Sequence, residues 1–205
     1  MPPVAMVPAA QRLNRVLRRV PTAVVWLGGL LPGAWLVWQL VEGRLGPDPL
    51  KPLEHGLGLH GLQFLIAALC VTPILRTTGI NLIRFRRALG VTGFAYALAH
   101  LLVWLLLDMQ LRWDEILRDL TRRPYIMIGM LAFVLLVPLA ATSTDSALRR
   151  MGAAAWRRLH LLAWPATLAA AIHYMMVVKA WPLQPMVYLA LVLGLLGARF
   201  ARMWR

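Results

Sequence analysis

The chain has 205 residues, a net charge of +14 and an apolar composition of 60%, with a mean hydropathy of +0.66. These values exclude an ordinary soluble domain, in which apolar residues make up about 45–50%. The single cysteine, Cys70, excludes a disulfide or a cysteine-based metal site within one chain, and we interpret it as a packing residue.

Six stretches without Asp, Glu, Lys or Arg follow one another along the chain. Each is 19 to 22 residues long, and such a helix spans about 30 Å, the thickness of the hydrocarbon core of a bilayer. We therefore predict an all-α fold, a polytopic integral membrane six-helix bundle that forms a single transmembrane domain over residues 1–205. The predicted spans are 20–41, 55–75, 88–107, 124–144, 159–178 and 180–198.

The connections between the spans are short. Residues 42–54 contain three prolines and form a turn-rich loop, whereas the apolar pattern of DMQLRWDEILRDLTRR predicts a short amphipathic helix on the outer surface. Around KAWPLQP there is room only for a turn. We expect the first stretch to be a span and not a cleaved signal peptide, because it is too long. No repeat is strong enough to indicate the inverted halves of a transporter.

The distribution of charge predicts the orientation of the bundle. With the N-terminus in the cytoplasm, 15 basic residues lie on the inner side and 7 on the outer side. By the positive-inside rule, both termini are therefore cytoplasmic. The basic charge is then explained by topology and contact with the lipid bilayer, and we expect no nucleic acid partner.

All five histidines lie within or at the edge of a predicted span, where an ionisable residue is costly and indicates function. His100 lies about 18 Å from the inner end of its span and His173 about 21 Å from the inner end of its own. The two imidazoles can therefore reach the same level on different helices. That arrangement is what two axial ligands of one haem require, and it makes His100 and His173 the strongest candidates for haem iron ligands.

His160 lies at the inner edge of the fifth span, about 20 Å below His173, and is a candidate ligand for a second, inner haem. On an ideal helix the two histidines would point about 220° apart, although Pro165 between them can kink the helix. At the level of His160, the third span offers Arg86 and Arg87 but no histidine. The outer site is therefore the stronger prediction.

Two further histidines have competing interpretations. His60 lies near the level of His100 and His173, with glycines beside it at 56, 58 and 61, and is a weak alternative ligand. A polar contact near the outer interface is the interpretation we favour. For His55 we favour a solvated rim residue over a quinone or partner-docking role. The basic segment INLIRFRR favours lipid headgroups, with a flavin phosphate or a cytoplasmic donor as alternatives.

Several segments together resemble the MsrQ (YedZ) family, the haem-binding membrane subunits of bacterial periplasmic methionine sulfoxide reductase systems. This family belongs to the ferric-reductase-like transmembrane family. The resemblance covers nearly the whole chain. It rests on the segments DPLKPLEHGLG, TPILRTTG, RRALGVTGFAYALAHLLVWL, RPYIMIGM, TSTD and WRRLHLLAWPATLAAAIHYMMVVKAWPLQPMVY.

The resemblance implies a membrane electron-transfer subunit in the bacterial inner (cytoplasmic) membrane. Such subunits pass electrons from the quinone pool, or from a cytoplasmic flavin reductase, through b-type haem to a periplasmic molybdopterin-containing methionine sulfoxide reductase subunit. Catalysis, the repair of oxidised envelope proteins, then lies on the partner. The haem histidines of the family map onto His100, His160 and His173. FMN is implied by the resemblance alone.

An alternative is a proton or small-solute transporter of six helices that uses the intramembrane histidines as a relay. Such a relay needs acidic partners inside the spans, and all eight carboxylates lie at span ends or in loops. The sequence contains no glycine fingerprint for a nucleotide, so electrons must arrive from a quinone or a separate reductase. We therefore expect electron transfer.

Overall fold

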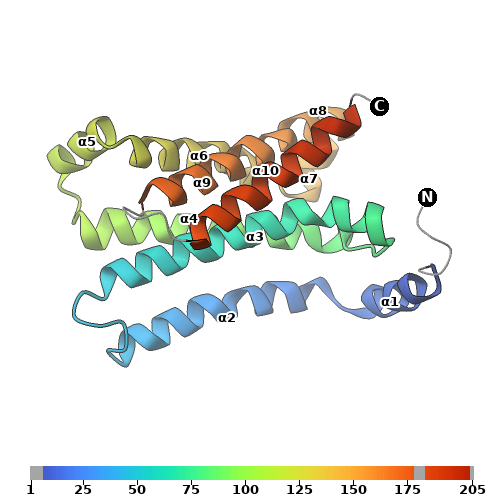
Figure 1. Cartoon of the computed structure of the whole chain (residues 1–205), viewed down its shortest axis with the longest axis horizontal. Helices are drawn as coiled ribbons and strands as arrows, with labels where there is room; N and C mark the ends of the chain where they lie inside the picture. The colour runs from blue at the N-terminus through green and yellow to red at the C-terminus, as the bar shows by residue number, and fades with distance from the viewer. Residues whose placement is uncertain (1–6, 178–182, 204–205) are drawn as a thin grey trace.

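The computed structural model describes residues 7–177 and 183–203 (Figure 1). Within these ranges every regular element is a helix and no strand occurs. Six segments are long and apolar enough to cross a membrane, which confirms the predicted all-α, six-helix, multi-pass fold. They are Thr22–Val41, Leu50–Thr78, Ile83–Asp108, Pro124–Ala141, Ala153–Val177 and Leu183–Ala201.

Two of the six segments are built from more than one helical element. The third segment consists of η2 (Ile83–Phe85), α4 (Arg86–Leu102) and the π-helical η3 (Val103–Asp108). The fifth consists of α8 (Ala153–Leu159), the 3₁₀ turn η4 (His160–Leu162) and α9 (Ala163–Val177). The other four are the continuous helices α2 (Thr22–Val41), α3 (Leu50–Thr78), α6 (Pro124–Ala141) and α10 (Leu183–Met203).

Several helices extend beyond the charge-free stretches of the sequence. Helix α3 begins at Leu50 and therefore includes Lys51 and Glu54, which the sequence had placed in a loop. Charged side chains at a helix end can reach the headgroup region, so a charge-free stretch marks only the hydrocarbon-spanning part of the helix. The predicted end of the fifth span at 178 and start of the sixth at 180 lie outside the described residues.

Among the residues that the structure describes, three shorter helices lie outside the six segments: α1 (Val7–Arg19), α5 (Trp113–Arg122) and α7 (Asp145–Met151). Helix α5 confirms the amphipathic helix predicted in the third connection. Helix α1 was not anticipated. It is tied to the connection between α3 and α4, because the side chain of Asn14 donates to the carbonyl of Gly79 (2.9 Å) and accepts from the amide of Asn81 (2.8 Å).

Four helices form the centre of the bundle and position the site. Helix α3 packs along α4 and α6 packs along α9, while α2 lies against α3 and α4, and α10 against α9 (Figure 1). One of the buried apolar clusters joins the two central pairs through Leu65 of α3, Leu136 of α6 and Ala166 of α9. Buried apolar side chains therefore fill part of the interface between the α3–α4 pair and the α6–α9 pair.

The break in the fifth segment follows from Pro165, which occupies the third position of α9. Proline is tolerated there because the N–H groups of a first helical turn have no intrahelical partner. The residues immediately before α9 form the tighter turn η4 instead of continuing α8. The α-helix is thus interrupted next to Pro165, where the sequence suggested a kink, and the interruption lies between His160 and His173.

Candidate functional site

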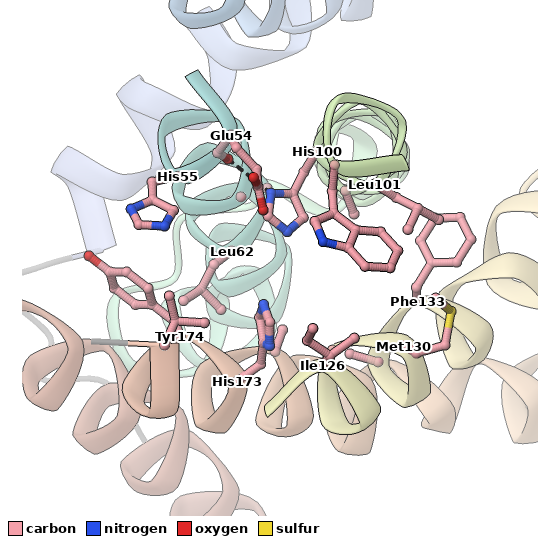
Figure 2. A pocket seen from close by; sticks show the side chains of 18 of the residues that line it. Glu54, His55, Leu62, His100, Leu101, Ile126, Met130, Phe133, His173 and Tyr174 are labelled. Carbon is pink, nitrogen blue, oxygen red and sulfur yellow. Dashed lines mark hydrogen bonds between the residues drawn. The ribbon is translucent and has the colours of Figure 1, made fainter. Parts of the chain in front are cut away.

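A cavity of about 290 Å³ lies among α3, α4, α6 and α9 (Figure 2). Most of its lining is apolar, including Leu62, Leu101 and Phe133. Three of the five histidines line it, His55 at one end and His100 and His173 from opposite helix pairs. The cavity therefore combines apolar walls with a small number of convergent polar groups, as ligand sites in helical bundles do.

His100 of α4 and His173 of α9 face each other across this cavity. Their ring centroids are 6.1 Å apart and the ring planes are inclined by 69°. The level match predicted from the sequence is therefore present, and the two imidazoles meet although 72 residues of chain separate position 173 from position 100.

Each of these imidazoles is held by one backbone carbonyl of the neighbouring helix. Nδ1 of His100 donates to the carbonyl oxygen of Glu54 on α3 (2.9 Å), and Nδ1 of His173 donates to that of Tyr125 on α6 (2.7 Å). A carbonyl can only accept, so Nδ1 carries the proton in both neutral rings and Nε2 keeps a free lone pair. This is the tautomer that a metal-ligating histidine needs.

Charged residues line the cavity near the beginnings of α3 and α6. They include the basic residues Lys51 and Arg123 and the carboxyl groups of Glu54 and Asp108, with His55 beside them. The guanidinium of Arg123 donates to the hydroxyl of Tyr125 (3.1 Å) and pairs with Asp119 (3.0 Å). The hydrogen bond with Tyr125 raises the pKa of Arg123, so this cation stays charged.

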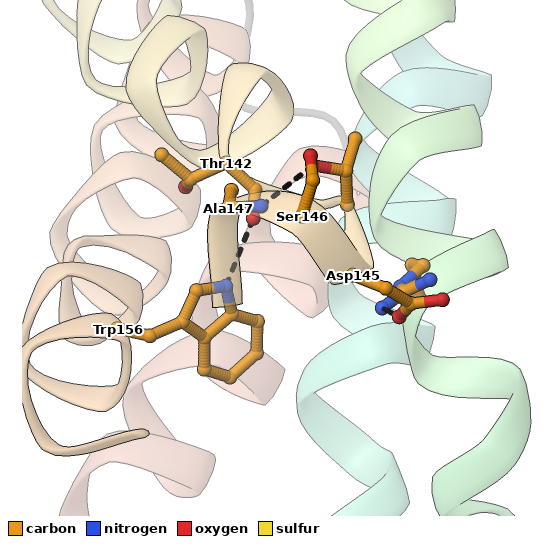
Figure 3. A network of polar contacts seen from close by, with 7 residues as sticks. Thr142, Asp145, Ser146, Ala147 and Trp156 are labelled. Carbon is orange, nitrogen blue, oxygen red and sulfur yellow. Dashed lines mark hydrogen bonds and ion pairs between the residues drawn. The ribbon is translucent and has the colours of Figure 1, made fainter. Parts of the chain in front are cut away.

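His160 lies outside this cavity, in η4. The ring of Trp156 stacks on it with centroids 3.7 Å apart, and its Nε2 lies 3.2 Å from the hydroxyl of Thr142. Trp156 in turn donates to the carbonyl of Thr142 (2.9 Å), as Figure 3 shows. These contacts tie η4 and α8 to the end of α6, and no histidine of the described chain faces His160.

The same end of the bundle contains a second set of polar contacts (Figure 3). The hydroxyl of Thr144 caps α7 by accepting from the amide of Ala147 (3.2 Å), and Arg87 of α4 forms a hydrogen-bonded ion pair with Asp145. The hydrogen bond from Arg87 lowers the pKa of Asp145. The TSTD segment therefore acts as a structural link between α4, α6 and α7.

His60 does not line the cavity. Its Nδ1 lies 3.0 Å from Oε1 of Gln63, and the amide of Gln63 donates to the hydroxyl of Tyr188 on α10 (2.7 Å). The ring also contacts Tyr96 edge-on. These partners agree with the favoured interpretation of His60 as a polar contact.

Sequence reasoning missed the two carbonyl groups that hold the imidazoles. A backbone acceptor leaves no direct signal in a sequence, since every residue carries one. His55, for which a rim position was favoured, does lie at the charged end of the cavity. The sequence thus identified His100 and His173 as candidates that share a level, and it did not identify the carbonyl groups that orient them.

Comparison with known proteins places the chain in a family. Residues 56–182 match the model of the ferric reductase like transmembrane component. No solved structure matches. Relatives named protein-methionine-sulfoxide reductase heme-binding subunit MsrQ occur in Brucella ovis, Brucella suis and Brucella melitensis. Each is 45% identical over 179 residues, which cover 87% of this chain and 81% of the relative. The chain therefore belongs to the ferric-reductase-like transmembrane family and, within it, to the MsrQ family.

Proposed function

We propose that this chain is the haem-binding membrane subunit of a methionine sulfoxide reductase system, and that it carries electrons across the bacterial inner membrane. The observation that carries the proposal is the pair of imidazoles, His100 and His173, that face each other in an apolar cavity. The family membership and the names of the relatives support the same conclusion.

The spacing of the pair suits two imidazoles that would hold one iron between them. A metal–nitrogen bond of about 2 Å, plus roughly 1 Å from a ring nitrogen to the ring centre, separates two such rings by about 6 Å. The observed separation of the centroids is 6.1 Å. The free lone pair on each Nε2, opposite a hydrogen-bonded Nδ1, suits the same role.

The rest of the cavity favours haem over a bare metal ion. Protein sites for bare ions use about three or more side-chain ligands, and the described residues contain no group of three or more His, Cys, Asp or Glu that could hold one. A haem would need only the two imidazoles, His100 and His173, from this chain. Apolar walls suit its ring, and Lys51 and Arg123 at the charged end suit its carboxylates.

The residues of the chain have separate tasks in this site. His100 and His173 would hold the haem, the carbonyls of Glu54 and Tyr125 orient the two rings, and the apolar walls exclude water. When bound, haem supplies reversible one-electron chemistry at a potential that ligands and burial set. Catalysis on methionine sulfoxide belongs to the periplasmic molybdopterin-containing partner subunit.

His160 is proposed as the ligand of a second, inner haem, which would extend the electron path toward the cytoplasmic side. Support comes from its position in the fifth segment and from the family resemblance. The electron donor is proposed to be the quinone pool or a cytoplasmic flavin reductase, and FMN is proposed from the resemblance alone. His60 remains a weak alternative ligand.

The test is the optical spectrum of the purified protein. We expect a reducible b-type haem spectrum that is lost in His100→Ala and in His173→Ala and retained in His60→Ala, because His60 is an intramembrane histidine outside the cavity. A correctly inserted but colourless protein would contradict the proposal. Reduction of the haem by a quinol or by a flavin reductase, added separately, identifies the donor.

A further inference from the structure

The two hydrogen bonds that hold the imidazoles are built in the same way. In each, a histidine in the second helix of a pair donates to a carbonyl in the first helix, and the chain separations are 46 and 48 residues. One helical turn after the acceptor, both first helices carry a glycine: Gly58 follows Glu54, and Gly129 follows Tyr125. Residues four apart lie on the same helix face, so each glycine lies beneath the ring.

A side chain would collide with the imidazole at Gly129 and would crowd it at Gly58. A Cβ atom at Gly129 would lie 2.7 Å from Nδ1 and 2.8 Å from Cε1 of His173. At Gly58 it would lie 3.1 Å and 3.3 Å from the same two atoms of His100. By contrast, nothing lies within 4 Å of the corresponding position at Gly28 or Gly90. The missing side chains are therefore what allows the two rings to lie against the helix backbones.

Most of the lining of the cavity repeats this correspondence, and the lining residues Lys51, Asp108, Met109 and Arg123 at the charged end lie outside it. Every lining residue of α6 in 125–136 has a lining counterpart on α3 in 54–65, at a constant offset of 71 positions (125 against 54). The lining residues 170–177 of α9 correspond in the same way to residues 97–104 of α4 and η3, at an offset of 73 (170 against 97). The identical pairs are Gly58 and Gly129, Leu65 and Leu136, Ala97 and Ala170, and His100 and His173.

The two helix pairs also run in the same direction. Helices α3 and α6 start at one end of the bundle, and α4 and α9 return to it (Figure 1). Equivalent residues therefore lie at equivalent depths in the two pairs. The cavity is thus enclosed by two half-sites of similar construction that face each other.

From this geometry we infer that Gly58 and Gly129 are paired positioning residues of the haem site, and that the site is a duplicated half-site. In each half, one imidazole lies against a glycine, its Nδ1 donates to the carbonyl one helical turn earlier, and its Nε2 would be left to hold the haem. The inference rests on the proposed haem function and adds residues that act through His100 and His173.

The two glycines should differ in their sensitivity to substitution. Cβ contacts below 3.0 Å are essentially never tolerated, so Gly129→Ala forces His173 away from the carbonyl of Tyr125. The contact at Gly58 is tight but can be relieved by a shift of a few tenths of an ångström. Alanine also favours a helix over glycine, so neither substitution should weaken its helix where the ring is absent.

The experiment compares the unchanged protein with Gly58→Ala and Gly129→Ala, and uses Gly28→Ala and Gly90→Ala as matched controls. We measure the haem-to-protein ratio, the reduced and oxidised spectra and the thermal unfolding of each. Gly129→Ala should weaken haem binding by about 10- to 100-fold, as loss of an orienting contact does. Gly58→Ala should lose less haem but show shifted bands that indicate altered axial ligation. The controls should match the unchanged protein.

The outcomes separate this inference from the proposed function. A colourless unchanged protein would contradict the haem proposal itself. A coloured protein whose Gly58→Ala and Gly129→Ala variants keep full haem and unchanged bands would overturn only the positioning role. An equal loss in Gly90→Ala would do the same, since the loss would then not depend on contact with a ring. If Gly129→Ala fails to insert, the band shift in Gly58→Ala decides.

Discussion

The hydroxyl group of Tyr96 on α4 forms hydrogen bonds with two backbone groups of α2 and so joins the two helices. It donates to the carbonyl of Gly29 (2.8 Å) and accepts from the amide of Gly33 (2.6 Å). These two groups lie one helical turn apart, next to Pro32, which has no N–H to donate. Since hydrocarbon offers no water to replace either partner, the phenol is a structural part of the α2–α4 contact.

Removal of this hydroxyl should therefore destabilise the bundle. We expect Tyr96→Phe to lower the free energy of unfolding by about 1–3 kcal/mol, because a buried carbonyl and amide lose a partner. Tyr188→Phe, which removes one hydrogen bond to the side chain of Gln63, should cost less, about 0.5–1.5 kcal/mol. Thermal or denaturant unfolding in detergent measures both. Equal stability of Tyr96→Phe and the unchanged protein would contradict this role.

At the same residue scale, the sequence identifies the candidate ligands His100 and His173 but not the glycines that lie beneath their rings. His100 and His173 could be paired because depth along a straight helix follows from residue number. The glycine beneath each ring could not be assigned. Gly58 has two glycine neighbours, at 56 and 61, which suggested a close approach to His60, whereas Gly129 is a single glycine in an apolar helix. Which ring lies on which backbone depends on helix packing, which residue numbers do not determine.

At the scale of elements, the fifth segment separates two histidines into different environments. A continuous helix would turn His160 and His173 about 220° apart, but η4 and Pro165 interrupt it. His160 contacts Thr142 and Trp156 at one end of the bundle, and His173 lies in the cavity. Sequence reasoning identified Pro165 as a possible kink but could not predict the turn before it.

Because His160 and His173 lie in different environments, a substitution at His160 should not disturb the site of His100 and His173. We expect His160→Ala to keep the spectral signature of the His100–His173 site, because no atom that holds those rings belongs to η4. The haem-to-protein ratio then tests the second site: a ratio near two that falls to one in His160→Ala assigns an iron to His160. Loss of all haem in a correctly inserted His160→Ala protein would contradict the independence of the two positions.

At the scale of the whole molecule, the duplicated cavity explains why no repeat was visible in the sequence. Four of the eleven corresponding lining pairs are identical, and the others include pairs as different as Glu54 with Tyr125 and Trp104 with Val177. Lipid-facing positions accept many apolar side chains, so they retain no trace of a repeat. The similarity lies in which positions of the two helix pairs line the cavity. This correspondence becomes visible only when the three-dimensional structure places the two pairs face to face.

The orientation of the bundle remains the largest prediction that charge alone supports. Six spans bring the starts of α1 and α2 and the end of α10 to the same side of the bundle (Figure 1), and the excess of 15 basic residues over 7 indicates that this side is cytoplasmic. On this orientation, the charged end of the cavity, with Lys51 and Arg123, would face the periplasm.

Reporter fusions test this orientation. Alkaline phosphatase, which is active only after export, should be inactive when fused after Arg205 and active when inserted in the loop between α2 and α3. A fluorescent protein that folds only in the cytoplasm should show the opposite pattern. An active phosphatase at the C-terminus would show that the bundle has the opposite orientation in the membrane. The charged end of the cavity would then face the cytoplasm, and electrons from a cytoplasmic donor would reach its haem before any other.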